Sequence, residues 1–169
     1  RCNVTNDCTV EEFLQNVPTN PRFLYSALGR FDTADTKDFF ESAGVPLKVE
    51  RGNRVFPASD KAADIIDALF FQLRRLKVPV LQERVENLIC EDGAITGVET
   101  EQGSYGCKAV ILATGGLSYQ ATGSTGDGHR MAQELGHTIV EPKPSLVPLE
   151  SPDEFCAQMQ GLALKNVTL

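Results

Sequence analysis

Two glycine-rich loops in the second half of the chain have the composition of a backbone that binds phosphate or sugar groups. The first, Thr114-Gly115-Gly116, directly follows the apolar run 109–113. The second, residues 122–128, has the sequence Thr-Gly-Ser-Thr-Gly-Asp-Gly and precedes a helical pattern. Glycine allows close approach of a ligand without a Cβ clash, and free N–H groups at a helix N-terminus bind anions. The second loop alone is typical of an ordinary surface loop, but its position after the first favours a ligand site.

Few side chains have the type and spacing of catalytic or metal-binding groups. His129 is the best candidate for an acid or base catalyst by residue type, but it lies in the first turn of an expected helix, where a surface position is the simpler interpretation. Ser118 and Tyr119 are candidates for lining a substrate side. The two histidines and five cysteines form no metal-ligand spacing and no Cys-x-x-Cys pair. The sequence therefore identifies no catalytic residue and predicts no metal site.

The charge balance argues against a nucleic-acid partner. The chain has 16 basic and 23 acidic residues, a net charge of -7, whereas nucleic-acid binders usually carry a basic face. The longest basic cluster, Arg74, Arg75 and Lys77, lies at the end of an expected helix, where cations complement the helix dipole. No apolar run approaches the roughly 20 residues that span a bilayer, so no membrane partner is expected. Scattered single cysteines favour a reducing, cytoplasmic location, and no pattern indicates an oligomeric state.

Residues 1–59 predict a small helical insertion closed by a hairpin. The polar loop 1–8 leads to Thr9, which forms a capping box with Glu12 at the start of a helix that ends near Val17. Further helices are expected from Asn20-Pro21 to Gly29 and from Thr36 to Ala43, and hairpin strands at 47–50 and 55–56.

Residues 60–142 alternate between helix and strand. A helix over 60–76, capped by Ser59, shows apolar residues at helical spacing. The apolar run 109–113 predicts a strand buried on both faces of a mainly parallel sheet. A helix is expected from Gly126 to Leu135, and Asp92-Gly93 predicts a tight hairpin turn. The other expected strands are 80–82, 85–90, 94–100, 103–107 and 139–141.

The pattern after residue 142 changes again. Strands are expected at 146–149 and 163–169, with a short helix opened by Ser151-Pro152 between them. The whole predicts a mixed α/β chain in three parts: a loop, helical insertion and hairpin (1–59), part of a nucleotide-binding domain with a β-meander (60–142), and a crossover into a second, truncated domain (143–169). Because the chain starts at Arg1 rather than Met and ends on a strand-like run, we interpret it as an internal piece of a longer protein.

Five short motifs follow one another along the chain. They are Arg1-Cys2-Asn3-Val4-Thr5-Asn6, Arg54-Val55-Phe56-Pro57-Ala58-Ser59, Ala113-Thr114-Gly115-Gly116-Leu117-Ser118-Tyr119, the loop 122–128, and residues 144–149. Together they resemble FAD-dependent flavoproteins of the aminoacetone-oxidase-like or bile-acid-reductase type, over essentially the whole chain. Ala-Thr-Gly-Gly followed by Thr-Gly-Asp-Gly is more distantly similar to the flavoprotein subunits of succinate dehydrogenase and fumarate reductase. One departure is Gln120, where family members often have proline.

The resemblance implies a fold of two dinucleotide-binding domains that holds FAD, with NAD(P)H as a reductant. In the family, a Gly-x-Gly-x-x-Gly turn binds the FAD pyrophosphate. The sequence contains no such turn, and the resemblance places it upstream of Arg1. We therefore expect the chain to carry part of the cofactor site, and to bind FAD weakly or not at all on its own.

The resemblance also assigns cofactor roles to two groups of residues. The loop Arg1–Asn6 would pass beside the pyrophosphate and flavin, or be only a capped loop before the first helix; Cys2 would lie near the flavin ring or be a buried thiol. Val85 would bracket the adenine with its backbone, or be an ordinary strand valine. Asp127 would face the flavin or cap its helix. The candidate cofactor-binding residues are Arg1, Cys2, Asn3, Thr5, Asn6, Val85, Ala113, Thr114, Gly115, Gly116, Gly126 and Asp127.

The activity implied by the resemblance is an oxidoreductase that transfers hydride between a nicotinamide or an organic small-molecule substrate and FAD. Two alternatives remain open. One is a non-catalytic flavin-binding or interaction module. The other is a tRNA-modifying flavoprotein, which shares the Ala-Thr-Gly turn but is disfavoured by the acidic charge balance. The sequence identifies neither the substrate nor the preferred nicotinamide.

Overall fold

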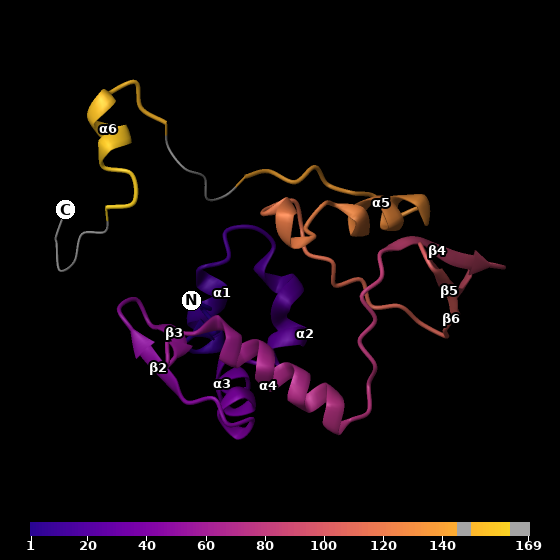
Figure 1. Cartoon of the computed structure of the whole chain (residues 1–169), viewed down its shortest axis with the longest axis horizontal. Helices are drawn as coiled ribbons and strands as arrows, with labels where there is room; N and C mark the ends of the chain where they lie inside the picture. Colours follow the sequence, from indigo (N-terminus) through magenta and orange to yellow (C-terminus); the bar gives the residue numbers. More distant parts are fainter. Residues whose placement is uncertain (145–149, 163–169) are drawn as a thin grey trace. The chain divides into compact units, whose positions relative to one another are not determined.

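A computed structural model describes residues 1–144 and 150–162, and their contacts cluster into two units, Arg1–Gln82 and Glu83–Leu169 (Figure 1). The predicted domain boundaries at 59/60 and 142/143 remain a prediction. No helix in the described part of the chain is long and apolar enough to cross a bilayer.

Two of the helices at the start of the first unit begin at side-chain caps. Helix α1, Val10–Gln15, has the predicted capping box: the Glu12 amide donates to Thr9 Oγ1 (3.2 Å) and the Thr9 amide donates to the Glu12 carboxylate (2.8 Å). The 3₁₀ helix η1, Pro21–Leu24, runs into α2, Tyr25–Leu28. Helix α3, Thr33–Ser42, begins three residues earlier than predicted, because a second capping box lies just before it.

The N-cap residue of α3, Asp32, is expected to contribute measurably to the free energy of unfolding. The Asp32 carboxylate accepts hydrogen bonds from the amides of Ala34 (2.7 Å) and Asp35 (2.9 Å). We expect Asp32→Ala to lower the free energy of unfolding by about 0.5–2 kcal/mol in urea titration, the usual cost of losing an N-cap. Asp38→Ala, at an exposed position within the same helix, is the control. Equal losses in both variants would contradict a capping role.

A three-stranded antiparallel sheet supports the first unit. Strands β1 (Thr5–Asn6), β2 (Leu47–Glu50) and β3 (Arg54–Pro57) lie in the order β1-β3-β2. The β2–β3 hairpin confirms the prediction. Strand β1 was missed, because two polar residues carry no alternating pattern and only pairing with β3 makes them a strand.

The core of the first unit lies where α3, α4 and the sheet meet. Helix α4, Ala62–Arg75, buries Ile65 and Ala68 beside Val45, and β3 contributes the wholly buried Val55. The prediction that Ser59 caps this helix was wrong: the cap residue is Lys61, which makes no side-chain cap hydrogen bond, and the Ser59 hydroxyl accepts from the Lys61 amide (3.2 Å) one step earlier. The other side of α4 stays apolar and exposed, at Ile66, Leu69, Phe70 and Phe71.

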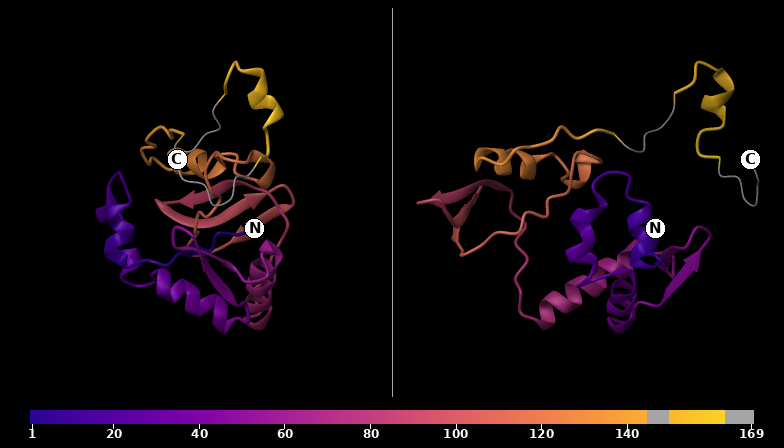
Figure 2. Two further views of the ribbon diagram at one scale, coloured as in Figure 1. Left: turned by 90° about the vertical axis from the view of Figure 1, so that its left-hand side faces the viewer. Right: turned by 180° about the vertical axis from the view of Figure 1, so that it is seen from behind.

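The second unit contains an antiparallel meander with α5 alongside its first strand (Figure 2). The meander consists of β4 (Val85–Glu91), β5 (Ala94–Thr100) and β6 (Gly103–Gly106) in sequence order. The predicted turn between β4 and β5 is confirmed, with φ of 50° at Asp92 and 77° at Gly93. Helix α5 spans Asp127–Glu134, preceded by the 3₁₀ helix η2 (Gln120–Thr122); the short α6 follows at Glu154–Gln158.

Three predicted strands are absent, which corrects the sequence interpretation. Residues 80–82, 109–113 and 139–141 form no strand in the structure. The run 109–113 has no pairing partner among the described residues, and Ile111 is 90% exposed rather than buried. A parallel strand exists only through hydrogen bonds to a neighbour, and both sheets of the described residues are antiparallel. The predicted strands at 146–149 and 163–169 and most of the 144–149 motif lie outside the described residues.

Candidate functional site

A cavity of about 270 Å³ in the second unit brings together three predicted cofactor residues. Val85 comes from the start of β4, Thr114 from the first glycine turn and Asp127 from the start of α5. The lining combines a few polar side chains with a larger number of apolar ones. The other lining residues are Glu83, Arg84, Leu88, Val98, Val110, Ile111, Leu112, Gly123 and Met131.

The two glycine loops pack closely on each other beside this cavity, to whose lining they contribute Thr114 and Gly123. A Cβ on Gly128, which is buried in the first turn of α5, would lie 2.3 Å from Thr114 Oγ1. A Cβ on Gly126 would lie 2.6 Å from Leu117 Cδ2, and one on Gly115 would lie 2.9 Å from Ser124 Oγ. Gly115 and Gly126 also have φ of +75° and +85°, a region that disfavours side chains. The glycines are thus needed where the loops meet.

Asp127 is one of three charged residues in the cavity lining, with Glu83 and Arg84. Its carboxylate accepts a hydrogen bond from Thr125 Oγ1 (2.8 Å) and pairs with Arg84 Nη2 (3.1 Å). The Thr125 hydrogen bond, and then the positive charge of Arg84, lower the pKa of Asp127 below its ordinary value of 3.8. The cap residue of α5 is Gly126, which has no side chain to cap with. Asp127 is the first residue of the helix and makes no cap hydrogen bond of its own, so the capping interpretation of Asp127 is not supported.

The lowered pKa of Asp127 predicts how stability depends on pH. A carboxyl whose pKa falls on folding stabilises the fold above its unfolded value, and loses that contribution as pH drops through the folded value. We therefore expect Asp127→Asn to unfold at lower urea than wild type near neutral pH, and this difference to shrink as the pH falls below 3.8. Asp67→Asn, on an exposed side of α4, is the control. A wild-type–variant difference that does not change with pH would contradict this role.

The remaining predicted residues of the second unit lie around the cavity rather than in its lining. Ala113, Gly115 and Gly116 follow one another along the exposed segment that carries Thr114. Gly126 contacts this segment through Leu117, as described above. Ser118 and Tyr119 are also exposed, and neither they nor His129 are part of the lining. The structure assigns no catalytic role to these three side chains.

The predicted loop at the start of the chain is held within the first unit. The Arg1 guanidinium pairs with Glu50 (2.5 Å) and Asp60 (2.9 Å) and lies over the Phe56 ring, 4.0 Å from its centre. Cys2 packs against the core of the unit. The other three predicted residues are Asn3, which is exposed, and Thr5 and Asn6, which form β1.

Asn6 lies at a second, more polar cavity of about 540 Å³ in the first unit. Its amide donates to the Gly52 carbonyl (3.0 Å) at the tip of the β2–β3 hairpin, and Cys8 and Glu12 line the same cavity. Burial raises the pKa of the Cys8 thiol, with Glu12 and Asp7 adding to the effect, which keeps this thiol protonated and weakly nucleophilic.

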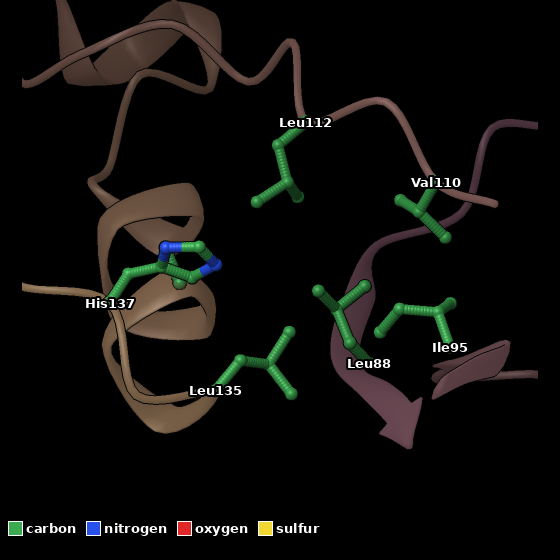
Figure 3. A pocket seen from close by; sticks show the side chains of 7 residues that line it. Leu88, Ile95, Val110, Leu112, Leu135 and His137 are labelled. Atoms are coloured by element: carbon green, nitrogen blue, oxygen red, sulfur yellow. The ribbon is translucent and has the colours of Figure 1, made fainter. Parts of the chain in front are cut away.

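An apolar hollow that was not among the sequence-based expectations lies next to the first cavity. Figure 3 shows side chains from α5 and the turn after it, from the meander and from the extended segment pointing into one space of about 440 Å³. Leu88, Val110 and Leu112 line both this hollow and the cavity at Thr114. His137 is the one titratable side chain in its lining. The strong apolar character of residues 109–113 was the available signal, but it was interpreted as a paired strand.

Two arginines were also missed. Arg84 precedes Val85 and pairs with Asp127, and Arg130 follows Asp127 by one helical turn. The i,i+3 spacing of Asp127 and Arg130 was a signal for the second of these, but nothing in the sequence indicated that Arg84 would reach α5. The described residues contain no group of three or more histidine, cysteine or acidic side chains arranged to hold a metal ion.

Comparison with known proteins places these features in a family. Residues 1–168 match the family described as HI0933-like protein Rossmann domain. The chain is 34% identical over 164 residues to a 3-dehydro-bile acid delta(4,6)-reductase from Clostridium scindens, covering 96% of this chain and 39% of that protein.

Two further relatives are named as ribosomal RNA dihydrouridine synthases. Identity is 26% over 170 residues to the protein of Haemophilus influenzae, covering 96% of this chain and 41% of the relative. It is 27% over 164 residues to that of Escherichia coli, covering 96% and 40%. The chain thus spans about two fifths of the length of the curated relatives that it matches.

Proposed function

The chain belongs to the HI0933-like Rossmann-domain family of FAD-dependent proteins, and on that premise we propose that it supplies part of the FAD site of a flavin-dependent oxidoreductase. The observation that carries this proposal is the cavity where Val85, Thr114 and Asp127 meet. These three residues come from distant parts of the sequence, and the resemblance assigns all of them to one cofactor. That they line one cavity supports a common role.

The size and lining of the cavity suit one end of a dinucleotide. Ligand pockets usually measure about 300–1,000 Å³, so a cavity of about 270 Å³ holds a part of FAD and not the whole. Its apolar lining residues fit a flat ring, and its polar lining residues, Thr114 and Asp127 among them, fit the hydrogen-bonding edge of that ring. We assign this space to the adenosine end, with the Val85 backbone facing the adenine.

The glycine loops suit the backbone of the cofactor. Gly115 and Gly116 present main chain without side chains on an exposed segment next to Thr114. Main-chain N–H groups of such a turn donate hydrogen bonds to phosphate or ribose oxygens. Two observations support this fit: a Cβ on Gly116 would meet nothing within 4 Å, and Gly115, Gly126 and Gly128 let the two loops pack closely and so hold this turn beside Thr114.

When bound, FAD supplies the hydride-accepting and hydride-donating chemistry. The residues of this chain bind and orient it. Val85 and Thr114 hold the adenosine end, and the N–H groups of the exposed glycines donate hydrogen bonds to the sugar–phosphate part. Asp127, kept ionised by Thr125 and Arg84, accepts hydrogen bonds from hydroxyl groups, because an ionised carboxylate can only accept.

A reduced nicotinamide and a small organic molecule are the proposed reaction partners. The relative named as a bile acid reductase supports a reductive reaction on an organic substrate. The alternative is a protein that holds its flavin for a structural purpose and catalyses no reaction.

RNA modification is a second candidate function, favoured by the two relatives named as ribosomal RNA dihydrouridine synthases. This candidate is close to the RNA-modifying flavoprotein that the Ala-Thr-Gly turn left open as an alternative. The net charge of -7 weighs against an RNA-binding face on this chain. The chain spans about two fifths of the length of these relatives, so its charge does not describe the rest of such a protein.

The proposal is tested on the full-length protein as purified. We expect the visible absorption bands of oxidised flavin, release of FAD on denaturation, and bleaching of the bands by NADH or NADPH. A colourless protein that takes up no FAD would contradict the cofactor assignment. A flavin that no nicotinamide or organic substrate bleaches would support the structural alternative. Filter binding of ribosomal and transfer RNA, with dihydrouridine analysis, decides the RNA candidate.

A further inference from the structure

Strand β4 begins with an irregularity that leaves one carbonyl outside the sheet pairing. Val85 lies opposite Thr100 on β5, and Asn87 lies opposite Glu99, so Glu86 is an extra residue. A β-bulge of this kind disrupts the ladder locally and leaves the extra residue unpaired. The Glu86 carbonyl accepts a hydrogen bond from Arg130 Nη2 of α5 (2.5 Å). A helix arginine thus takes the place of the missing strand partner.

A second arginine makes the reverse contact on the other side of Val85. Arg84 Nη2 lies 3.1 and 3.4 Å from the two carboxylate oxygens of Asp127, in the first turn of α5. The Arg84 carbonyl also accepts from the Glu101 amide (3.3 Å) beyond the end of β5. One arginine therefore reaches from strand to helix and the other from helix to strand, with Val85 between them.

The two arginines use their donors differently. Arg84 makes contact through one nitrogen to one carboxylate. Arg130 uses the whole fork: Nη2 to the Glu86 carbonyl, Nη1 to Glu134 (2.8 and 3.0 Å) and to Asn87 Oδ1 (3.5 Å), and Nε 4.0 Å from Asp127. A lysine can replace a single contact to a carboxylate, but it cannot reproduce a planar fork with several partners.

The exposure of these side chains limits what they contribute to overall stability. Arg84 is 60% exposed and Arg130 is 43% exposed, and ion pairs this exposed add little to the free energy of folding. Their effect is local, because both contacts fix the first residues of β4 against the first turn of α5, where Val85 and Asp127 line the cavity.

We propose that Arg84 and Arg130 form a two-arginine clasp that positions the Val85 backbone at the adenosine end of the cavity. The inference rests on the proposed FAD site but names residues that neither the motifs nor the family resemblance assigns. The clasp residues are positioning residues: Arg84 acts through Asp127, and Arg130 acts through the carbonyl of the bulge. They set the register of the strand that faces the ligand.

The test uses the full-length protein and four variants, Arg130→Met, Arg130→Lys, Arg84→Met and Arg84→Lys. Arg75→Met is the control, because Arg75 is exposed and has no side-chain hydrogen bond or ion pair among the described residues. Two quantities are measured: amide hydrogen exchange of residues 84–88 in the FAD-free protein, and the dissociation constant for FAD by flavin fluorescence. The urea midpoint of each variant shows whether it is folded.

We expect Arg130→Met to speed exchange at 84–88 and weaken FAD binding by about tenfold each, the factor that losing one hydrogen bond to a charged group gives. Arg130→Lys fails to restore either quantity, because the fork is lost. Arg84→Met shows a smaller change, of about two- to fivefold, because an exposed ion pair contributes little, and Arg84→Lys restores it, because one ammonium–carboxylate contact is enough. The control and the urea midpoints stay close to wild type.

Exchange rates within twofold of wild type in both methionine variants would overturn the clasp, as would full rescue by Arg130→Lys. If Arg130→Met does not fold, the Arg84 pair of variants decides the same question. If wild type binds no FAD, the proposed function fails, while the exchange measurement on the FAD-free protein still decides the clasp. Faster exchange with an unchanged dissociation constant would also overturn the proposal, because the strand would then move without consequence for the ligand.

Discussion

Gly128→Val is expected to destabilise the second unit and to abolish retention of FAD through purification. A Cβ at this position would lie 2.3 Å from Thr114 Oγ1, with the Thr114 Cβ only 3.6 Å away, and Gly128 is a buried residue in the first turn of α5. Thr114 is β-branched and stiff, so the segment carrying it must move out of the cavity wall. Overpacking of this kind costs about 1–3 kcal/mol, measurable by urea unfolding.

Gly116→Val is the matched control for that substitution. A Cβ on Gly116 meets nothing within 4 Å, and its φ is not in the left-handed region. We therefore expect this variant to keep wild-type stability, so that any change in FAD retention reports direct crowding of the cofactor. Gly128→Ala should fall between wild type and Gly128→Val. Full FAD occupancy in Gly128→Val would show that the contact between the two glycine loops does not shape the site.

Met131→Ala is expected to lower the free energy of unfolding of the second unit by about 2–5 kcal/mol, the usual range for truncating a buried methionine. Met131 is 2% exposed, the most buried large side chain of α5, and it forms part of the cavity wall behind Thr114 and Asp127. Its loss enlarges the cavity and removes the main apolar contact of α5 in this unit. Urea unfolding followed by circular dichroism measures the change.

Met131→Leu provides the control, because a volume-conserving swap costs less than about 1.5 kcal/mol. Exchange protection in the first unit, around Val55, should be unchanged in both variants, since Val55 belongs to a separate cluster of contacts. A loss below about 1 kcal/mol in Met131→Ala would mean that α5 is held mainly by its polar contacts, contrary to the burial of Met131.

Local signals in the sequence predicted the local structure well. The capping box at Thr9, the β2–β3 hairpin and the Asp92-Gly93 turn are confirmed, because each depends on residues within a few positions of one another. The family was predictable too, since the motifs are short and ordered, and the match over residues 1–168 confirms it. The two glycine loops, which the sequence singled out as a ligand site, pack on each other in the structure, and their role in binding stays a prediction.

Features that depend on distant partners were not predictable. The run 109–113 has the composition of a buried strand, but a strand also needs a neighbour, and the described residues supply none. Strand β1 shows the converse, since two polar residues become a strand only through β3. Arg84 and Arg130 were missed because their partners, Asp127 and the carbonyl of a bulge, become visible only once α5 lies beside β4.

The most direct test of the FAD assignment is a crystal structure of the full-length protein with FAD bound. We expect the adenosine end within hydrogen-bond distance of the Val85 backbone and of Thr114, with the exposed glycines after Thr114 next to the sugar–phosphate part. FAD bound at full occupancy away from both Val85 and Thr114 would contradict the account, whatever the activity of the protein.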